Sequence, residues 1–242
     1  MHVRAVNTAP DSENKIHDDS VATQYGFRGG LVPGVTVYGY LAAAACQHFG
    51  PDWLERGAMD VRFHQPVYHD EEIAVSVQPQ PDGRARIEVT GRASAIAWLH
   101  CERPSMPADE RPLERKPPSH ETLAAGTILG AIAPRIDLAQ SRVSAPLAPE
   151  LHGRVHPAIL LALANQIFVD NYRLGPWIHA ASEVRKFASA KDGDELHVRA
   201  RVADRYERKG HEFVILDVNI AHAGRTIETV RHTAIWQPRT TR

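Results

Sequence analysis

Two stretches of this 242-residue chain are predicted to form helices that are apolar on almost every side. The first runs from about residue 35 to residue 49 and contains four consecutive alanines, Ala42 to Ala45. The second runs from about residue 157 to residue 171 and is rich in leucine and alanine. A helix without a polar face has to be buried nearly all round. Each stretch therefore needs other elements wrapped around it, and this requirement limits the fold more than any other feature.

Each predicted helix is followed by strand-like runs in the same order, which favours an internal duplication. In the first half these runs lie at 59–67, 72–77, 85–89 and 93–101. In the second half they lie at 181–187, 195–202, 212–220 and 226–236. The halves also align without a gap, 61–63 with 184–186 and 70–75 with 193–198. We expect a curved antiparallel sheet around each helix and edge-to-edge pairing of the two sheets, which would cover two strand edges.

A proline-rich and charged segment separates the two halves. It begins at Pro104, reaches Pro118 and has no apolar periodicity. Proline is excluded from helix interiors and central strands. The sequence therefore predicts two domains, 1–103 and 122–242, joined by an exposed linker at 104–121.

Composition and motifs exclude several classes of function. The chain has 28 Lys and Arg against 29 Asp and Glu, so no net field attracts nucleic acid or an anionic membrane. No apolar run approaches the roughly 20 residues that span a bilayer. The start lacks the apolar region of a secretory signal, and the two cysteines form no CxxC pair, so a cytoplasmic location is expected. His152 and His156 lack the glutamate of a zinc motif, and no phosphate-binding glycine loop occurs, so no metal and no cofactor are expected.

The segment ahead of the first helix contains the most informative motif. It reads S-E-N-K-I-H-D from Ser12, then Ala22, G-F at Gly26 and G-G-L-V-P-G ending at Gly34. This string resembles the signature of the MaoC-like (R)-specific enoyl-CoA hydratases, D-x-N-P-[LI]-H followed by A, G-F and a small-residue turn before the helix. The matching residues are Asn14, Ile16, His17, Ala22, Gly26, Phe27 and Gly34.

The resemblance implies a fold and a substrate class. The implied fold is an α+β double hot-dog, in which two central helices are each wrapped by an antiparallel sheet. The implied activity is that of a hydratase or dehydratase in fatty acid metabolism. Its substrate would be an enoyl-CoA, a 3-hydroxyacyl-CoA or the same acyl group on an acyl carrier. The pattern is also compatible with a homodimer.

The start of the first helix is a candidate substrate-binding site on physical grounds. Neither Pro33 nor Gly34 has a side-chain oxygen that could cap the first N–H groups. The helix dipole adds partial positive charge at this end, so a polarised oxygen would be stabilised there. In the resembled family the corresponding N–H group binds the thioester carbonyl. We therefore expect Pro33, Gly34 and Val35 to bind the substrate, in an acyl pocket between the halves.

The predicted catalytic residues are His17, Asn14 and Ser12. A histidine exchanges protons near neutral pH. The resemblance implies that His17 and the motif aspartate activate a water molecule, while Asn14 orients this water or fixes the loop. Ser12 stands where the family has that aspartate, and a serine cannot take a proton from water as a carboxylate can. Asp11 and Glu13 flank it, and a bulge could bring either into place.

The replacement of the aspartate leaves two other functions open. One is a non-catalytic protein that binds acyl thioesters or shapes the site of a partner. The other is a thioesterase on the same fold. Many hot-dog thioesterases use a carboxylate on the central helix, and residues 35–49 contain no Asp or Glu, which counts against the thioesterase.

Overall fold

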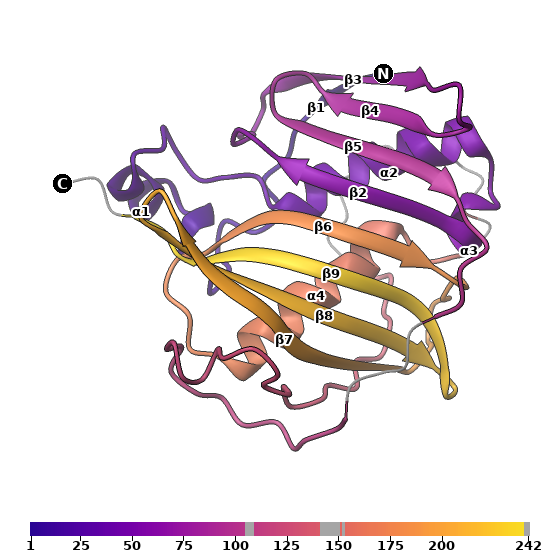
Figure 1. Ribbon diagram of the computed structural model, residues 1–242. Coiled ribbons are helices and arrows are strands. Elements are labelled where there is room, and N and C mark those ends of the chain that lie inside the picture. Colours follow the sequence, from indigo (N-terminus) through magenta and orange to yellow (C-terminus); the bar gives the residue numbers. More distant parts are fainter. Residues whose placement is uncertain (105–108, 141–150, 152, 240–242) are drawn as a thin grey trace.

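The computed structural model describes residues 1–104, 109–140, 151 and 153–239. These residues form one nine-stranded sheet of order β1-β3-β4-β5-β2-β6-β9-β8-β7. The two long helices, α2 (Gly34–Phe49) and α4 (Pro157–Asn171), both lie on one face of this sheet, behind it in Figure 1. No helix in the described part of the chain combines the length and apolarity needed to cross a membrane.

The first half of the sheet wraps α2. Its strands, in spatial order, are β1 (His2–Arg4), β3 (Glu72–Pro79), β4 (Ala85–Val89), β5 (Ala93–Leu99) and β2 (Gly57–Phe63). Ten consecutive residues of α2, from Thr36 to Ala45, are buried. The alanines have small side chains, so β3, β4 and β5 can pack against the helix from one side and α4 from another. The prediction of a helix buried on all sides is confirmed.

The second half repeats this arrangement around α4. Its strands are β6 (Ile178–Lys186), β9 (Arg225–Gln237), β8 (His211–His222) and β7 (Leu196–Arg208). Buried positions alternate along much of the strands, as in β8, where Val214, Leu216 and Val218 are buried. This alternation is the period-2 pattern that predicted the strands.

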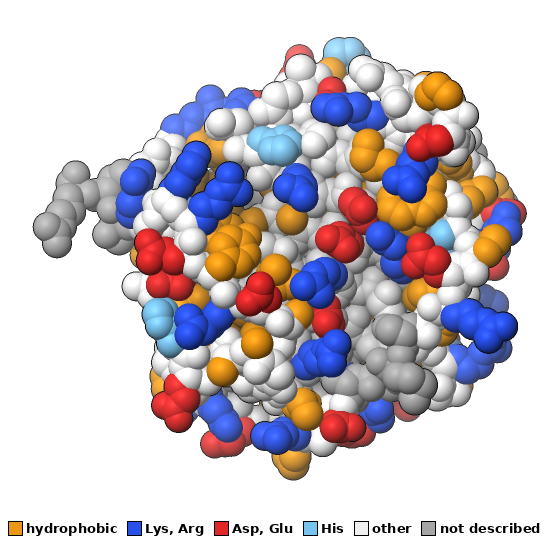
Figure 2. All heavy atoms as spheres, in the orientation of Figure 1, with side chains coloured by type: hydrophobic (Ala, Val, Ile, Leu, Met, Phe, Trp, Pro, Cys, Tyr) orange, Lys and Arg blue, Asp and Glu red, His pale blue; other side chains and the backbone are white. Residues whose placement is uncertain are grey.

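The two halves join into a single sheet through their neighbouring edges. Strand β2 pairs antiparallel with β6, with Ala58 opposite Arg185 and Arg62 opposite Ala181. On the helix-free face the Arg185 guanidinium donates to Asp60 across this junction at 2.7 Å. Figure 2 shows that charged side chains of both signs are spread over this face, which explains why it needs no further layer. Edge-to-edge pairing of the sheets was expected and is observed.

Several element limits differ from the predictions. Strand β2 ends at Phe63 rather than at 67, because the N–H groups of His64 and Gln65 turn back to the Arg92 carbonyl. Strands β7 and β8 form a longer hairpin than 195–202 and 212–220. A bulge between Val202 and Asp204 shifts the side-chain alternation there, so the period-2 pattern breaks while the strand continues.

The chain between the halves lies against the second half. Of the predicted linker, residues 105–108 lie outside the described residues, and 109–117 are exposed. Farther along, residues 128–135 follow the outer edge of β7 through isolated bridges such as Ile132 with Val198. Leu129, Ile132 and Ile136 are buried there. The sequence pattern predicted no element in this segment, nor the short helix α3 (Trp53–Arg56).

Candidate functional site

The motif loop folds over the start of α2 and is tied to the second half through Asn14. The Asn14 Oδ1 atom accepts hydrogen bonds from the backbone N–H groups of Ile16 at 3.4 Å and Trp177 at 3.1 Å. Its Nδ2 atom donates to the Trp177 carbonyl at 3.0 Å. A short amide side chain therefore caps a 3₁₀ turn at Lys15–His17 and fixes the loop to the chain just before β6.

The geometry around His17 determines its tautomer. The Nδ1 atom lies 2.7 Å from the Leu31 carbonyl oxygen, which can only accept, so Nδ1 carries the proton. The Nε2 atom then has the lone pair, and it lies 3.4 Å from the Asn14 amide nitrogen. Burial lowers the pKa of His17, against a smaller opposing effect of its hydrogen bond to Leu31. At neutral pH the side chain is thus a neutral base, and the lone pair of Nε2 faces the Asn14 amide.

The carboxylates next to Ser12 do not reach this histidine. Asp11 is exposed, and the Glu13 carboxylate forms an ion pair with Arg115. The Ser12 hydroxyl donates to the Asn14 carbonyl at 3.2 Å, a contact within the loop itself. The expectation that a bulge could bring Asp11 or Glu13 into place is therefore wrong for this structure.

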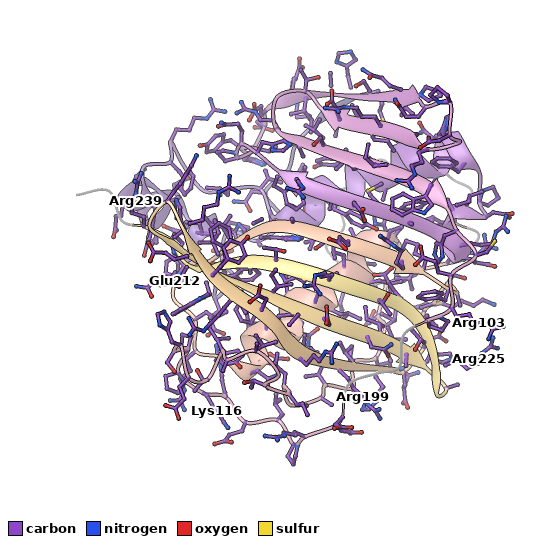
Figure 3. All side chains as sticks on the ribbon, viewed as in Figure 1. Arg103, Lys116, Arg199, Glu212, Arg225 and Arg239 are labelled. Atoms are coloured by element: carbon purple, nitrogen blue, oxygen red, sulfur yellow. The ribbon has the colours of Figure 1, made fainter. Side chains whose placement is uncertain are left out.

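A cavity of about 230 Å³ lies between the halves, beside His17 and the start of α2. From the first half it is lined mainly by Asn14, Ile16, His17, Leu31, Pro33, Gly34, Val37 and Phe63. From the second half it is lined by Asn165, Trp177, Ile178, His179, Ala180, His211 and Ile235. Among the described residues no Asp or Glu forms part of its wall, and neither Ser12 nor Val35 does. His211 is the first residue of β8, and the next residue, Glu212, is labelled in Figure 3.

The two long helices differ at their N-terminal ends. In α4 the side chain of His156 caps the helix by accepting from the Ala158 N–H at 2.9 Å. In α2 the N-cap residue is Pro33 and no side chain caps the first turn. The N–H groups of Thr36 and Val37 donate to the Pro33 carbonyl. Those of Gly34 and Val35 have no partner in the described part of the chain. Only the end of α2, which adjoins the cavity, is thus open to a ligand oxygen.

Sequence reasoning missed a cluster of His179, Ser182 and His232 on β6 and β9. The Ser182 hydroxyl lies 2.8 Å from His179 Nε2 and 3.2 Å from His232 Nδ1. All three side chains are buried, and the Nδ1 atom of His179 has no hydrogen-bond partner among the described residues. The detectable signal was a polar residue at an inward strand position, as His232 stands between the buried Val230 and Ala234.

His179 also changes the interpretation of Gly34. A Cβ atom added to Gly34 would lie 2.8 Å from His179 Nδ1 and 3.1 Å from its Cγ. The missing side chain at this position therefore makes room for the imidazole ring as well as for a ligand. A residue of the second half thus contacts the first turn of the first-half helix.

The matching region of the second half is closed. Lys186, which aligns with the cavity residue Phe63, forms an ion pair with Glu228, and both side chains are fully buried. The Lys186 charge also lowers the pKa of the nearby His156, although burial is the larger cause, and that pKa falls to about 3. The corresponding region of the second half thus contains a buried ion pair and a capped helix start.

No family model and no curated protein matches the sequence, whereas many solved structures match the fold. The double hotdog protein Rv0216 from Mycobacterium tuberculosis is 13% identical, with a TM-score of 0.62 over 97% of this chain and 93% of that one. A protein described as a MaoC domain dehydratase from Chloroflexus aurantiacus is 11% identical, with a TM-score of 0.59 over 99% and 93%. One described as an oleoyl thioesterase from Lactobacillus plantarum is 9% identical, with a TM-score of 0.56 over 100% and 96%. The chain has the double hot-dog fold, as the sequence predicted.

Proposed function

We propose that this double hot-dog chain is a MaoC-like hydratase or dehydratase that acts on enoyl or 3-hydroxyacyl thioesters of coenzyme A or of an acyl carrier. One observation carries the proposal. His17, whose Nε2 atom is deprotonated and faces the Asn14 amide, and the uncapped start of α2 adjoin the same largely apolar cavity. Addition of water to an enoyl thioester requires a base and a binding site for the carbonyl oxygen, and both adjoin this apolar pocket.

The carbonyl oxygen of the substrate would accept hydrogen bonds from the Gly34 and Val35 N–H groups. When water adds to the β-carbon, the electrons of the double bond move toward this oxygen and an enolate forms. Donors that are already oriented toward such a charge each contribute about 3–4 kcal/mol in the transition state. The positive end of the α2 dipole adds to this stabilisation.

His17 would be the single acid–base group. Its Nε2 atom takes one proton from the attacking water while the water oxygen bonds to the β-carbon. The imidazolium then returns this proton to the α-carbon, so the elements of water are added and the histidine is neutral again. Dehydration is the reverse sequence. The lowered pKa of His17 favours the neutral form that the hydration direction needs.

We assign supporting roles to Asn14 and Ser12. Asn14 holds the loop against Trp177 and faces Nε2 of His17, so it would orient the histidine or its water. Ser12 bonds within the loop and lies outside the cavity wall, so we assign it a structural part. Because a general acid or base contributes about 10²- to 10⁴-fold, we expect a rate below that of an enzyme with the full aspartate–histidine pair.

The test is hydration of enoyl-CoA substrates of increasing chain length, followed by loss of the enoyl-thioester absorbance. We expect turnover by the wild type and its loss in His17→Gln. The matched control is His48→Gln, since His48 is exposed at the far end of α2. Turnover that survives His17→Gln would overturn the site assignment.

The same assay separates the two other functions. Release of free thiol from a saturated acyl-CoA would identify a thioesterase, for which the cavity wall offers no carboxylate among the described residues. Binding of enoyl-CoA without turnover at any chain length would identify a non-catalytic acyl-thioester protein.

A further inference from the structure

His179 is one of three described residues on the cavity wall with a buried polar atom that has no hydrogen-bond partner among the described residues; the other two are Asn165 and Trp177. The residue is buried, with a relative exposure of 7%. The ring contacts Phe63 edge-on, with centroids 4.8 Å apart, and lies against Gly34. Its Nδ1 atom nevertheless has no partner in the described part of the chain. Buried polar nitrogens are nearly always hydrogen-bonded, so we expect a bound ligand to hydrogen-bond to this atom.

The neighbours of His179 can fix the direction of its hydrogen bonds. Ser182 has one hydroxyl proton and lies between two imidazole nitrogens. If this hydroxyl donates to His179 Nε2, the proton of His179 is on Nδ1, beside the first turn of α2. The Ser182 oxygen then accepts from His232 Nδ1. In this arrangement each of the three groups makes one compatible bond, which leaves the Nδ1–H of His179 as a free donor and His232 Nε2 without a partner among the described residues.

We propose that His179 of the second half donates a hydrogen bond from Nδ1 to the thioester carbonyl oxygen and completes the oxygen-binding site at the start of α2. This inference rests on the function proposed above and deepens it. Ser182 and His232 are positioning residues, because they act by holding the tautomer and the ring of His179. The two halves would thus share the reaction, with the base on one and a carbonyl-binding group on the other.

Electrostatics favours a neutral imidazole in this role. A protonated ring would stand beside the positive end of α2, whereas a neutral N–H donor is not repelled there. Burial, with the nearby His232 as a smaller cause, holds the pKa of His179 well below its ordinary value, against a smaller opposing effect of a hydrogen bond with the Ala181 backbone. A neutral imidazole next to a helix N-terminus can polarise a carbonyl group without transferring its own proton. An acceptor such as the thioester oxygen would also satisfy the unpaired Nδ1–H.

The kinetic test uses two substitutions at His179. In His179→Phe the ring shape is kept and the donor is lost, so kcat for enoyl-CoA hydration should fall about 100-fold with a smaller change in KM. In His179→Asn the amide nitrogen can take the place of Nδ1, so part of this loss should be recovered. Ser182→Ala should give an intermediate loss, and His48→Gln serves as the matched control. A His179→Phe variant with wild-type kcat would overturn the inference while the proposed function stands.

A measurement independent of turnover distinguishes failure of the His179 inference from failure of the proposed function. Butyryl-CoA has a thioester carbonyl but no double bond, so it binds without being hydrated. In protein labelled with ¹⁵N-histidine, we expect the His179 signals to report an Nδ1–H tautomer and to shift when butyryl-CoA is added. An Nε2–H tautomer in the complex, or butyryl-CoA binding that leaves the His179 signals unchanged, would overturn the inference even if the wild type proved inactive.

Discussion

Replacement of Gly34 by alanine tests the contact that joins the two halves at the site. The new Cβ atom would lie 2.8 Å from Nδ1 of His179, closer than Cβ atoms approach other atoms in proteins, and 3.0 Å from the Cβ of His179, which is tighter than most such contacts. The imidazole cannot move away easily, because Ser182 holds it at 2.8 Å and Phe63 packs against it. Overpacking of this kind costs about 1–3 kcal/mol. Alanine returns up to about 1 kcal/mol through its better helix propensity. We therefore expect Gly34→Ala to lower the free energy of unfolding by about 1–2 kcal/mol.

The assay is urea unfolding of Gly34→Ala, His179→Ala and the double variant. If the clash with the ring is the cause, the cost of Gly34→Ala should become smaller in the His179→Ala background, where only the 3.0 Å contact with the Cβ of residue 179 remains. The expected coupling energy is about 0.5–3 kcal/mol. Gly175→Ala is the matched control, since a Cβ at Gly175 meets no atom within 4 Å. The reasoning is refuted if Gly34→Ala costs no more than Gly175→Ala, or if its cost is the same with and without His179.

Substitutions at three other places, His232, the Lys186–Glu228 ion pair and Asn14, test the physical account. His232 is buried and neutral with a pKa of about 3, against 6.5 as the ordinary value. The unfolded chain therefore binds the extra proton below pH 6.5, and stability falls as the pH drops from 6.5 toward 3. His232→Gln should reduce this fall by up to about 1.4 kcal/mol per pH unit, and equal slopes in urea titrations would contradict the assignment. Lys186→Met leaves the Glu228 carboxylate buried without a partner and should lower the free energy of unfolding by about 3–5 kcal/mol. The double variant Lys186→Met, Glu228→Gln should lose less stability. An equal loss in the two variants would argue against a buried charge at Glu228. Asn14→Ala should speed amide exchange at Trp177 and weaken acyl-CoA binding, and unchanged exchange would show that Asn14 does not fix the loop.

The architecture was predictable because burial leaves a periodic record in the sequence. The alanine run of α2 and the leucine-rich α4 had no polar face, and the repeated order of strands indicated the duplication. The predicted strand limits were wrong where a bulge interrupts the alternation of inward and outward side chains, as after Val202. The segment around Ile132 was missed because it joins the sheet edge through isolated bridges, which need no long alternating run.

The site was predictable only where its residues are close in sequence. Asn14, His17, Pro33 and Gly34 belong to one local motif, and all four line the cavity. His179 and His232 come from two strands of the other half, and their contact depends on the pairing of β6 with β9. No spacing rule relates such residues. The open end of α2 and the capped end of α4 also differ through one side chain, His156, which the sequence alone did not identify as a cap.

The central claim is that an acyl thioester binds with its carbonyl oxygen at the open end of α2, within reach of His17. A structure of the wild-type protein with butyryl-CoA measures this directly. We predict that the carbonyl oxygen lies about 3 Å from the Gly34 or Val35 nitrogen, with the acyl chain in the cavity between the halves. A carbonyl oxygen more than about 4 Å from both nitrogens, beyond hydrogen-bond range, or an acyl chain bound outside this cavity, would contradict the account.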